Sequence, residues 1–127
     1  MEAKIKTIPH SEMPYPTAGN WRVDDGLIEV EVADMKNEDY HFLVIVHELI
    51  EAYLCKRAGI TQESVDAFDI EFEKQRSKSL TLITAEPGDN RFAPYERQHN
   101  IASGIERILM AELGVKIQDY ESAINAL

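Results

Sequence analysis

Tyr40–Arg57, YHFLVIVHELIEAYLCKR, is the stretch that decides the fold of this 127-residue chain. It is apolar along most of its length, but three ionisable residues, His47, Glu48 and Glu51, stand in its middle. A helix that is apolar on nearly every side lies inside a protein. Ionisable groups inside a protein are costly unless they are paired or bind a metal ion. The stretch therefore predicts a central helix that carries a polar site.

The ends of this helix are marked in the sequence. Asn37 has the side chain of a good N-cap, and Gly59 is suited to the left-handed residue that ends a helix. We expect the helix to span Glu38–Arg57. Within it, His47 and Glu51 are four residues apart and share one face, while Glu48 lies about 100° further round the axis.

A hairpin is predicted before the helix. Trp21–Asp34 alternates apolar and polar residues around Asp24-Asp25-Gly26, which favours a tight turn between two antiparallel strands. Lys4–Ile8 alternates in the same way and predicts a further short strand. Several prolines and Gly19 separate that strand from the hairpin and favour irregular structure.

Further helices are predicted after the central one. Cap residues at Thr61 and Ser64 open a helical segment that fades by Ser77–Ser79, and Leu80–Thr84 fits either a strand or a helix. Pro94–Leu113 forms the next helix, and its expected core stripe is Ile101, Ala102, Ile105, Ile108, Leu109 and Leu113. A short helix around Asp119–Ala126 packs on the outside.

The order of elements predicts the fold class. We expect one α+β domain over residues 1–127, with a small antiparallel sheet packed on a central buried helix and further helices.

Charge and composition exclude several classes of function. The formal net charge of −10 repels phosphate backbones, so no nucleic-acid role is expected. The chain has no uncharged apolar run of about 18 residues, and no membrane role is expected. Its N-terminus lacks the apolar region of a secretory signal. The single cysteine, Cys55, is read as a small buried residue, and it fits a reducing cytoplasm.

The central helix carries a metal-binding pattern. His47-Glu48-Leu49-Ile50-Glu51 differs from the zinc-protease signature His-Glu-x-x-His at its last position, where a carboxylate replaces the second imidazole. A carboxylate also binds zinc, so His47 and Glu51 are predicted metal ligands. They need at least one further ligand. His99 is the first candidate, and Asp69 and then Asp66 follow because their segment comes directly after the helix.

At this point the chain resembles the zincin-like metallopeptidases, particularly the small ones, in which a twisted sheet precedes the metal-binding helix. The resemblance covers the order of elements over about residues 21–110 and the motif at residues 47–51. It implies zinc as the cofactor and Glu48 as the general base that takes a proton from metal-activated water. It also implies that Ile28–Val32 is an edge strand along the cleft, where a peptide or protein binds by strand addition. The chain is similar as well to small uncharacterised bacterial and phage proteins.

Other interpretations stay open at this level. His47 and Glu51 also fit a hydrogen-bonded pair in a core without a metal. With Asp69 among the ligands, the site suits manganese as well as zinc. Glu48 and Glu51 also fit a magnesium-dependent nucleotide pyrophosphohydrolase of all-α fold. A non-catalytic binding module is a third class. The sequence does not name a substrate or an oligomeric state.

Overall fold

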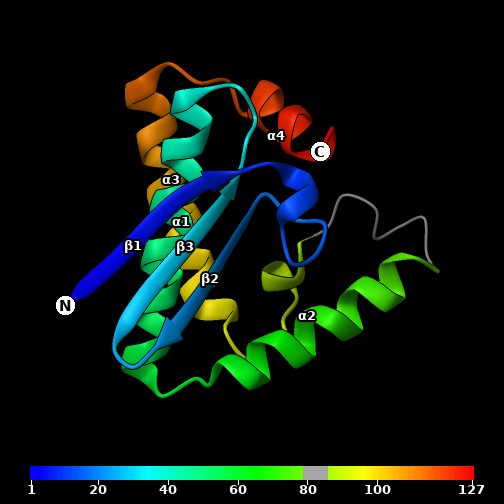
Figure 1. The fold of residues 1–127 in the computed structure, drawn as a ribbon. Coiled ribbons are helices and arrows are strands. Elements are labelled where there is room, and N and C mark those ends of the chain that lie inside the picture. The colour runs from blue at the N-terminus through cyan, green and yellow to red at the C-terminus, as the bar shows by residue number, and fades with distance from the viewer. Residues whose placement is uncertain (79–85) are drawn as a thin grey trace.

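A computed structural model describes residues 1–78 and 86–127, and Figure 1 shows the chain as a ribbon. The strands are β1 (Glu2–Ile8), β2 (Gly19–Asp24) and β3 (Leu27–Ala33), and the α-helices are α1 (Glu38–Ala58), α2 (Gln62–Arg76), α3 (Glu96–Leu113) and α4 (Ile117–Asn125). Short 3-10 helices form at η1 (His10–Glu12) and η3 (Pro87–Asp89). The predicted α+β class is confirmed. The segment Leu80–Thr84, for which strand and helix were both considered, lies outside the described residues.

The sheet has the order β1-β3-β2. β2 and β3 form the predicted antiparallel hairpin, and its turn uses positive φ angles at Asp25 (47°) and Gly26 (80°). β1 pairs with the other side of β3 in parallel, so the sheet is mixed and not purely antiparallel. The prediction that Ile28–Val32 is an edge strand along the cleft is therefore wrong. Those residues belong to β3, the central strand, and both of its sides are already paired.

The hairpin buries one face of its alternating pattern, as predicted. Ile28, Val30 and Val32 of β3 are fully buried. They pack against the side of α1 that carries Leu43 and Val44. Figure 1 shows the sheet lying across α1 and α3, so these two helices form the second layer of the structure.

Helix α1 begins and ends at the predicted caps. The Asn37 side chain accepts a hydrogen bond from the Tyr40 backbone N–H at 3.1 Å. Gly59 adopts the left-handed conformation with φ 71°, and its N–H donates to the carbonyl of Lys56. Cys55 is buried, as expected, and burial raises the pKa of its thiol to about 12. A thiol of this kind is not a nucleophile at neutral pH.

Helix α3 starts at Glu96, two residues later than predicted, and ends at Gly114 with φ 68°. Its predicted core stripe is largely wrong. Ile101, Ile105 and Ile108 are exposed, by 40%, 37% and 71%. The buried residues of α3 are instead His99, Ala102 and Met110. The helix therefore turns a partly polar side toward α1.

The remaining helices pack around this core. α2 is capped by the Thr61 hydroxyl, which accepts from the Ser64 N–H at 3.3 Å. α4 is not wholly peripheral, because Tyr120 is 2% exposed and its ring meets that of Tyr40 edge-on at 5.3 Å. None of the described helices combines the length and the apolar character that crossing a membrane requires.

Candidate metal centre

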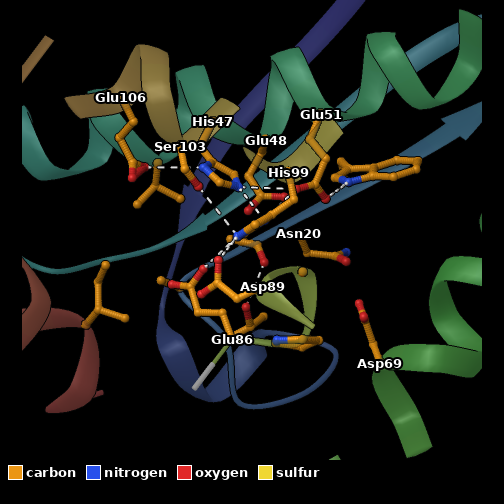
Figure 2. Close-up of a pocket in the computed structure, with 18 of the residues that line it drawn as sticks. Asn20, His47, Glu48, Glu51, Asp69, Glu86, Asp89, His99, Ser103 and Glu106 are labelled. Atoms are coloured by element: carbon orange, nitrogen blue, oxygen red, sulfur yellow. Dashed lines mark hydrogen bonds and ion pairs between the residues drawn. The ribbon is translucent and has the colours of Figure 1, made fainter. Parts of the chain in front are cut away.

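Three side-chain atoms from two helices converge on one point. His47 Nε2 lies 3.2 Å from Glu51 Oε2, and His99 Nδ1 lies 3.0 Å from the same oxygen. The two ring nitrogens are 3.2 Å apart. His47 and Glu51 share a face of α1 because they are four residues apart, and the packing of α3 on α1 brings His99 to that face (Figure 2). We refer to these three atoms as the ligand triangle.

Each of the three side chains has a second polar atom that is not part of the triangle. A neighbouring side chain contacts each of these atoms. Trp21 Nε1–H of β2 donates to Glu51 Oε1 at 2.9 Å, and both side chains are buried. His47 Nδ1 lies 3.5 Å from Oε2 of Glu106, which belongs to α3. Tyr120 OH of α4 donates to that same Glu106 oxygen at 3.3 Å. The orientation of His47 and Glu51 is thus set by β2, α3 and α4 together.

The outer nitrogen of His99 is held by the loop that precedes α3. His99 Nε2 lies 3.2 Å from Asp89 Oδ1 and 3.3 Å from Glu86 Oε2. Gly88 is buried directly against the ring, because a Cβ added to it would lie 2.3 Å from His99 Cγ. The segment Glu86-Pro87-Gly88-Asp89 therefore fixes the position of the His99 ring.

The charges of the triangle depend on one another. Burial alone would raise the pKa of Glu51, but hydrogen bonds from His47 and His99 lower it to about 2. Burial opposes the charged form of His99, yet the hydrogen bonds to Glu51 and Glu86 raise its pKa to about 10. The pKa of His47 is also raised well above its ordinary value, through Glu106 and Glu51, against the effect of burial. Without a metal ion, the neighbouring carboxylates thus favour the protonated form of both imidazoles.

Glu48 directly follows His47 on α1 and lies beside the triangle. Its Oε1 packs against the start of β2, since a Cβ on Gly19 would lie 2.6 Å from that oxygen. Burial and then the negative charge of Glu51 raise the pKa of Glu48 to about 8. Figure 2 shows Glu48 between His47 and Glu51, on the side of α1 that faces the cavity. A carboxyl group in this setting can take up and release a proton near neutral pH.

The structure does not bring Asp69 to the triangle. Tyr95 OH donates to Asp69 Oδ1, and Tyr15 OH lies 3.5 Å from Asp69 Oδ2. Asp69 is nonetheless buried and lines the same cavity as the triangle. Asp66 is exposed on α2. Of the predicted further ligands, only His99 lies with His47 and Glu51.

A cavity of about 370 Å³ contains the triangle and extends toward both α2 and α4. His10 of η1 is among its lining residues. His41, by contrast, accepts a hydrogen bond from the Met35 N–H at 2.9 Å, on the first turn of α1.

The outer edge of β2 borders the cavity, but its backbone groups are largely in use. The Gln62 side chain accepts from the Val23 N–H at 3.1 Å and donates to the Trp21 carbonyl at 3.2 Å. The Thr17 hydroxyl donates to the Gly19 carbonyl at 2.8 Å. Addition of a peptide strand to β2 would have to displace both side chains.

Sequence reasoning missed the outer partners of the triangle. The alternating pattern of Trp21–Asp34 does not report the hydrogen bond of Trp21 Nε1–H, and no motif marks Glu86 or Asp89 as partners of a histidine. Glu106 lies on the same helix as His99, but it contacts His47. The spacing of His99, Ser103 and Glu106, which places them on one helix face, is the signal in the sequence that could have indicated a polar interface there.

Comparisons with protein-family models, with curated proteins and with solved structures found no match to this chain.

Proposed function

We propose that this protein binds a zinc ion through His47 Nε2, Glu51 Oε2 and His99 Nδ1, and that it acts as a zincin-like hydrolase, with peptides as the first class of substrate to test. The observation that carries the proposal is the ligand triangle itself. Its three donor atoms lie 3.0 to 3.2 Å apart.

These distances suit a metal ion. Ligand atoms arranged tetrahedrally at bonds of about 2.0 to 2.1 Å from zinc lie about 3.3 to 3.4 Å apart. The triangle needs to widen by only a few tenths of an ångström to reach that geometry. Two histidines and one glutamate also form a ligand set of catalytic zinc sites, which leave a fourth position open. Replacement of the second motif histidine by Glu51 is therefore compatible with catalysis.

The surroundings support a cation more than a metal-free hydrogen-bonded pair. Histidine ligands of metals usually donate their other N–H to a carboxylate or carbonyl, and His47 and His99 both face carboxylates in this way. Glu48, Glu51, Glu86, Asp89 and Glu106 all lie on or next to the triangle. A dication offsets this negative charge and takes the place of the protons that the imidazoles otherwise hold.

Magnesium fits less well. Magnesium prefers an octahedral shell of oxygen atoms and keeps several waters. Two of the three donor atoms here are imidazole nitrogens, which favour zinc and other transition metals. The sheet also contradicts the all-α fold that the pyrophosphohydrolase alternative required.

When bound, zinc acts as a Lewis acid and lowers the pKa of a coordinated water. The residues of the chain then have separate tasks. Glu48 would accept, on its carboxylate, the proton that the attacking water loses, and it would deliver that proton to the leaving group as the scissile bond breaks. Trp21 and Glu106 keep Glu51 and His47 in position through the contacts described above.

Metal titration of the purified, metal-stripped protein tests the proposal. We expect one zinc per chain for the wild type, and a loss of affinity of at least about 100-fold for His47→Ala and His99→Ala, because each removes a ligand. His41→Ala is the matched control, since His41 is on the same helix but outside the triangle. Equal zinc affinity in the wild type and the two ligand variants would overturn the proposal.

Hydrolysis is tested separately. Glu48→Gln should keep the zinc and lose turnover of any peptide or ester substrate that the wild type cleaves. Retained turnover would remove Glu48 from the mechanism while leaving the metal site intact.

A further inference from the structure

Asp69 is a buried acid that the proposed metal site does not use. It projects from α2 toward the same cavity as the ligand triangle (Figure 2), and it is 9% exposed. A carboxylate in such a position either forms part of the internal scaffold or meets something that enters the cavity.

The hydrogen bonds of Asp69 come from two tyrosines. Tyr95, the residue directly before α3, donates its hydroxyl to Oδ1, and Tyr15 OH contacts Oδ2 only at 3.5 Å. The Tyr95 ring also stands edge-on to the His99 ring, with their centroids 6.3 Å apart. The Tyr95 side chain thus lies between Asp69 and His99, which is part of the triangle. A single small molecule is long enough to reach both Asp69 and the triangle.

The two hydrogen bonds to Asp69 come from neutral hydroxyl groups and bring no positive charge to it. In residues 1–78 and 86–127, no lysine, arginine or histidine forms an ion pair with it. The intervening segment 79–85 has the sequence SLTLITA and contains no basic residue. Burial and then the charges of Glu51 and Asp66 raise the pKa of Asp69 to about 6, so most of it is ionised at neutral pH. A buried charge without a counter-charge is costly to the protein.

The surroundings of Asp69 favour an organic cation over a second metal ion. Its hydrogen-bond partners are the hydroxyls of Tyr15 and Tyr95, and neutral tyrosine is a poor ligand for a divalent metal. Burial and nearby negative charge raise the pKa of both hydroxyls, so they stay neutral. Aromatic rings beside a carboxylate are a good environment for an ammonium or guanidinium group.

We propose that Asp69, Tyr15 and Tyr95 form a subsite for the cationic group of a ligand whose other end reaches the ligand triangle. This inference rests on the proposed function, and it names the class of substrate: a molecule with a basic side chain, such as a peptide with lysine or arginine close to the bond that is cleaved. Asp69 supplies the counter-charge, and the two tyrosine rings flank the cation.

Two hydroxamates that differ in one charge test the inference. Hydroxamates bind to protein-held zinc, and lysine hydroxamate has the linear side chain of norleucine hydroxamate plus a terminal ammonium. We expect the zinc-loaded wild type to bind lysine hydroxamate at least about 10-fold more tightly, as measured by calorimetry. Asp69→Asn should remove this preference and leave the affinity for norleucine hydroxamate within about twofold of the wild-type value.

Glu71→Gln is the matched control, because Glu71 lies on the same helix, is exposed and is not among the residues that line the cavity. It should keep the preference. Equal affinity of the wild type for the two compounds, failure of both to bind the zinc-loaded protein, or a preference that persists in Asp69→Asn would each overturn the inference. The wild-type comparison decides alone if Asp69→Asn does not fold. A wild type that holds no zinc would instead overturn the proposed function.

Discussion

Gly88 leaves the space that the His99 ring occupies. A Cβ at this position would lie 2.3 Å from Cγ and 2.4 Å from Nδ1 of the His99 ring. Gly88→Ala must therefore push the ring away from Glu51 or move the loop. Loss of an outer partner of a metal ligand costs about 10- to 100-fold in affinity. We expect a fall of that size in zinc affinity, measured by competition with a chelating dye.

Gly104→Ala is the control for this change. Gly104 lies within α3, and a Cβ there would meet nothing within 4 Å. Alanine is a better helix residue than glycine by roughly 0.5 to 1 kcal/mol, so this variant should be slightly more stable and bind zinc normally. Normal zinc affinity in Gly88→Ala would show that the loop does not hold the ring.

Asp69 should also make the stability of the metal-free protein depend on pH. Its folded pKa of about 6 is above the ordinary value near 4, so the folded protein binds the proton more tightly than the unfolded chain. The contribution of Asp69 to the free energy of unfolding is therefore greatest below about pH 4. This contribution decreases as the pH rises to about 6. Over this window we expect a loss of roughly 2 to 3 kcal/mol that Asp69→Asn does not show.

Urea denaturation at pH 4, 5, 6 and 7 measures the effect as the difference in unfolding free energy between the wild type and Asp69→Asn. Other groups titrate in the same range, but they are common to both proteins and cancel in the difference. A difference that stays constant across these pH values would contradict a raised pKa at Asp69.

At the residue scale, the sequence was informative about pairs within one helix and uninformative about contacts between elements. His47 and Glu51 could be placed together because helical periodicity fixes their relation. His99 could be proposed only as one of several candidates, since its approach depends on how α3 packs. The hydrogen bond from Trp21 to Glu51 joins residues that are 30 positions apart, and no local sequence pattern predicts it.

At the element scale, the Tyr120 hydroxyl links α4 to the residues around the ligand triangle. Tyr120 OH donates to Glu106 Oε2, which faces His47 Nδ1. Tyr120→Phe removes this bond and keeps the ring against Tyr40. We expect it to weaken zinc binding by less than Glu106→Gln, for which about 10- to 100-fold is expected, because it acts on His47 only through Glu106. Chelator competition measures both affinities.

Tyr40→Phe is the control, because it removes a hydroxyl from the other ring of the same edge-on pair. It should bind zinc as the wild type does. If Tyr120→Phe and Tyr40→Phe have equal, wild-type zinc affinities, α4 does not contribute to the position of His47.

Helix ends were predictable because they depend on local chemistry, as at Asn37 and Gly59. The buried face of α3 was not. The apolar stripe of Ile101, Ile105 and Ile108 suggested a core face, but α3 buries His99 against α1 instead. Hydrophobic periodicity assumes that a polar residue prefers water, and this assumption fails where buried polar residues bond to one another.

At the scale of the whole molecule, the order of the strands was the main feature that the sequence did not determine. The turn at Gly26 predicted the hairpin of β2 and β3, since such turns join neighbouring strands. The parallel pairing of β1 with β3 is made across an irregular segment, and no turn specifies it. That pairing makes β3 central and leaves β2 as the edge beside the cavity.

Zinc should stabilise the folded protein as a whole, because the triangle joins α1 to α3 and exists only when the two helices are packed. A ligand that binds only the folded state at 1,000 times its dissociation constant adds about 4 kcal/mol to the free energy of unfolding. In a chain of this size each kcal/mol raises the melting temperature by roughly 3 to 5 °C. We expect zinc to raise the melting temperature of the metal-stripped wild type by about 10 °C or more.

The net charge of −10 makes a control essential, since an acidic surface attracts any dication. His99→Gln keeps the surface charge and removes one ligand, so zinc should shift its melting temperature little. Magnesium at the same concentration should shift both proteins equally, and only by the small amount that surface binding gives, because imidazole nitrogens do not suit it. An equal zinc shift in the wild type and in His99→Gln would assign the effect to the surface and not to the triangle. A shift confined to the wild type, and unchanged by added salt, is the result that a buried site requires, since screening acts mainly on exposed charges.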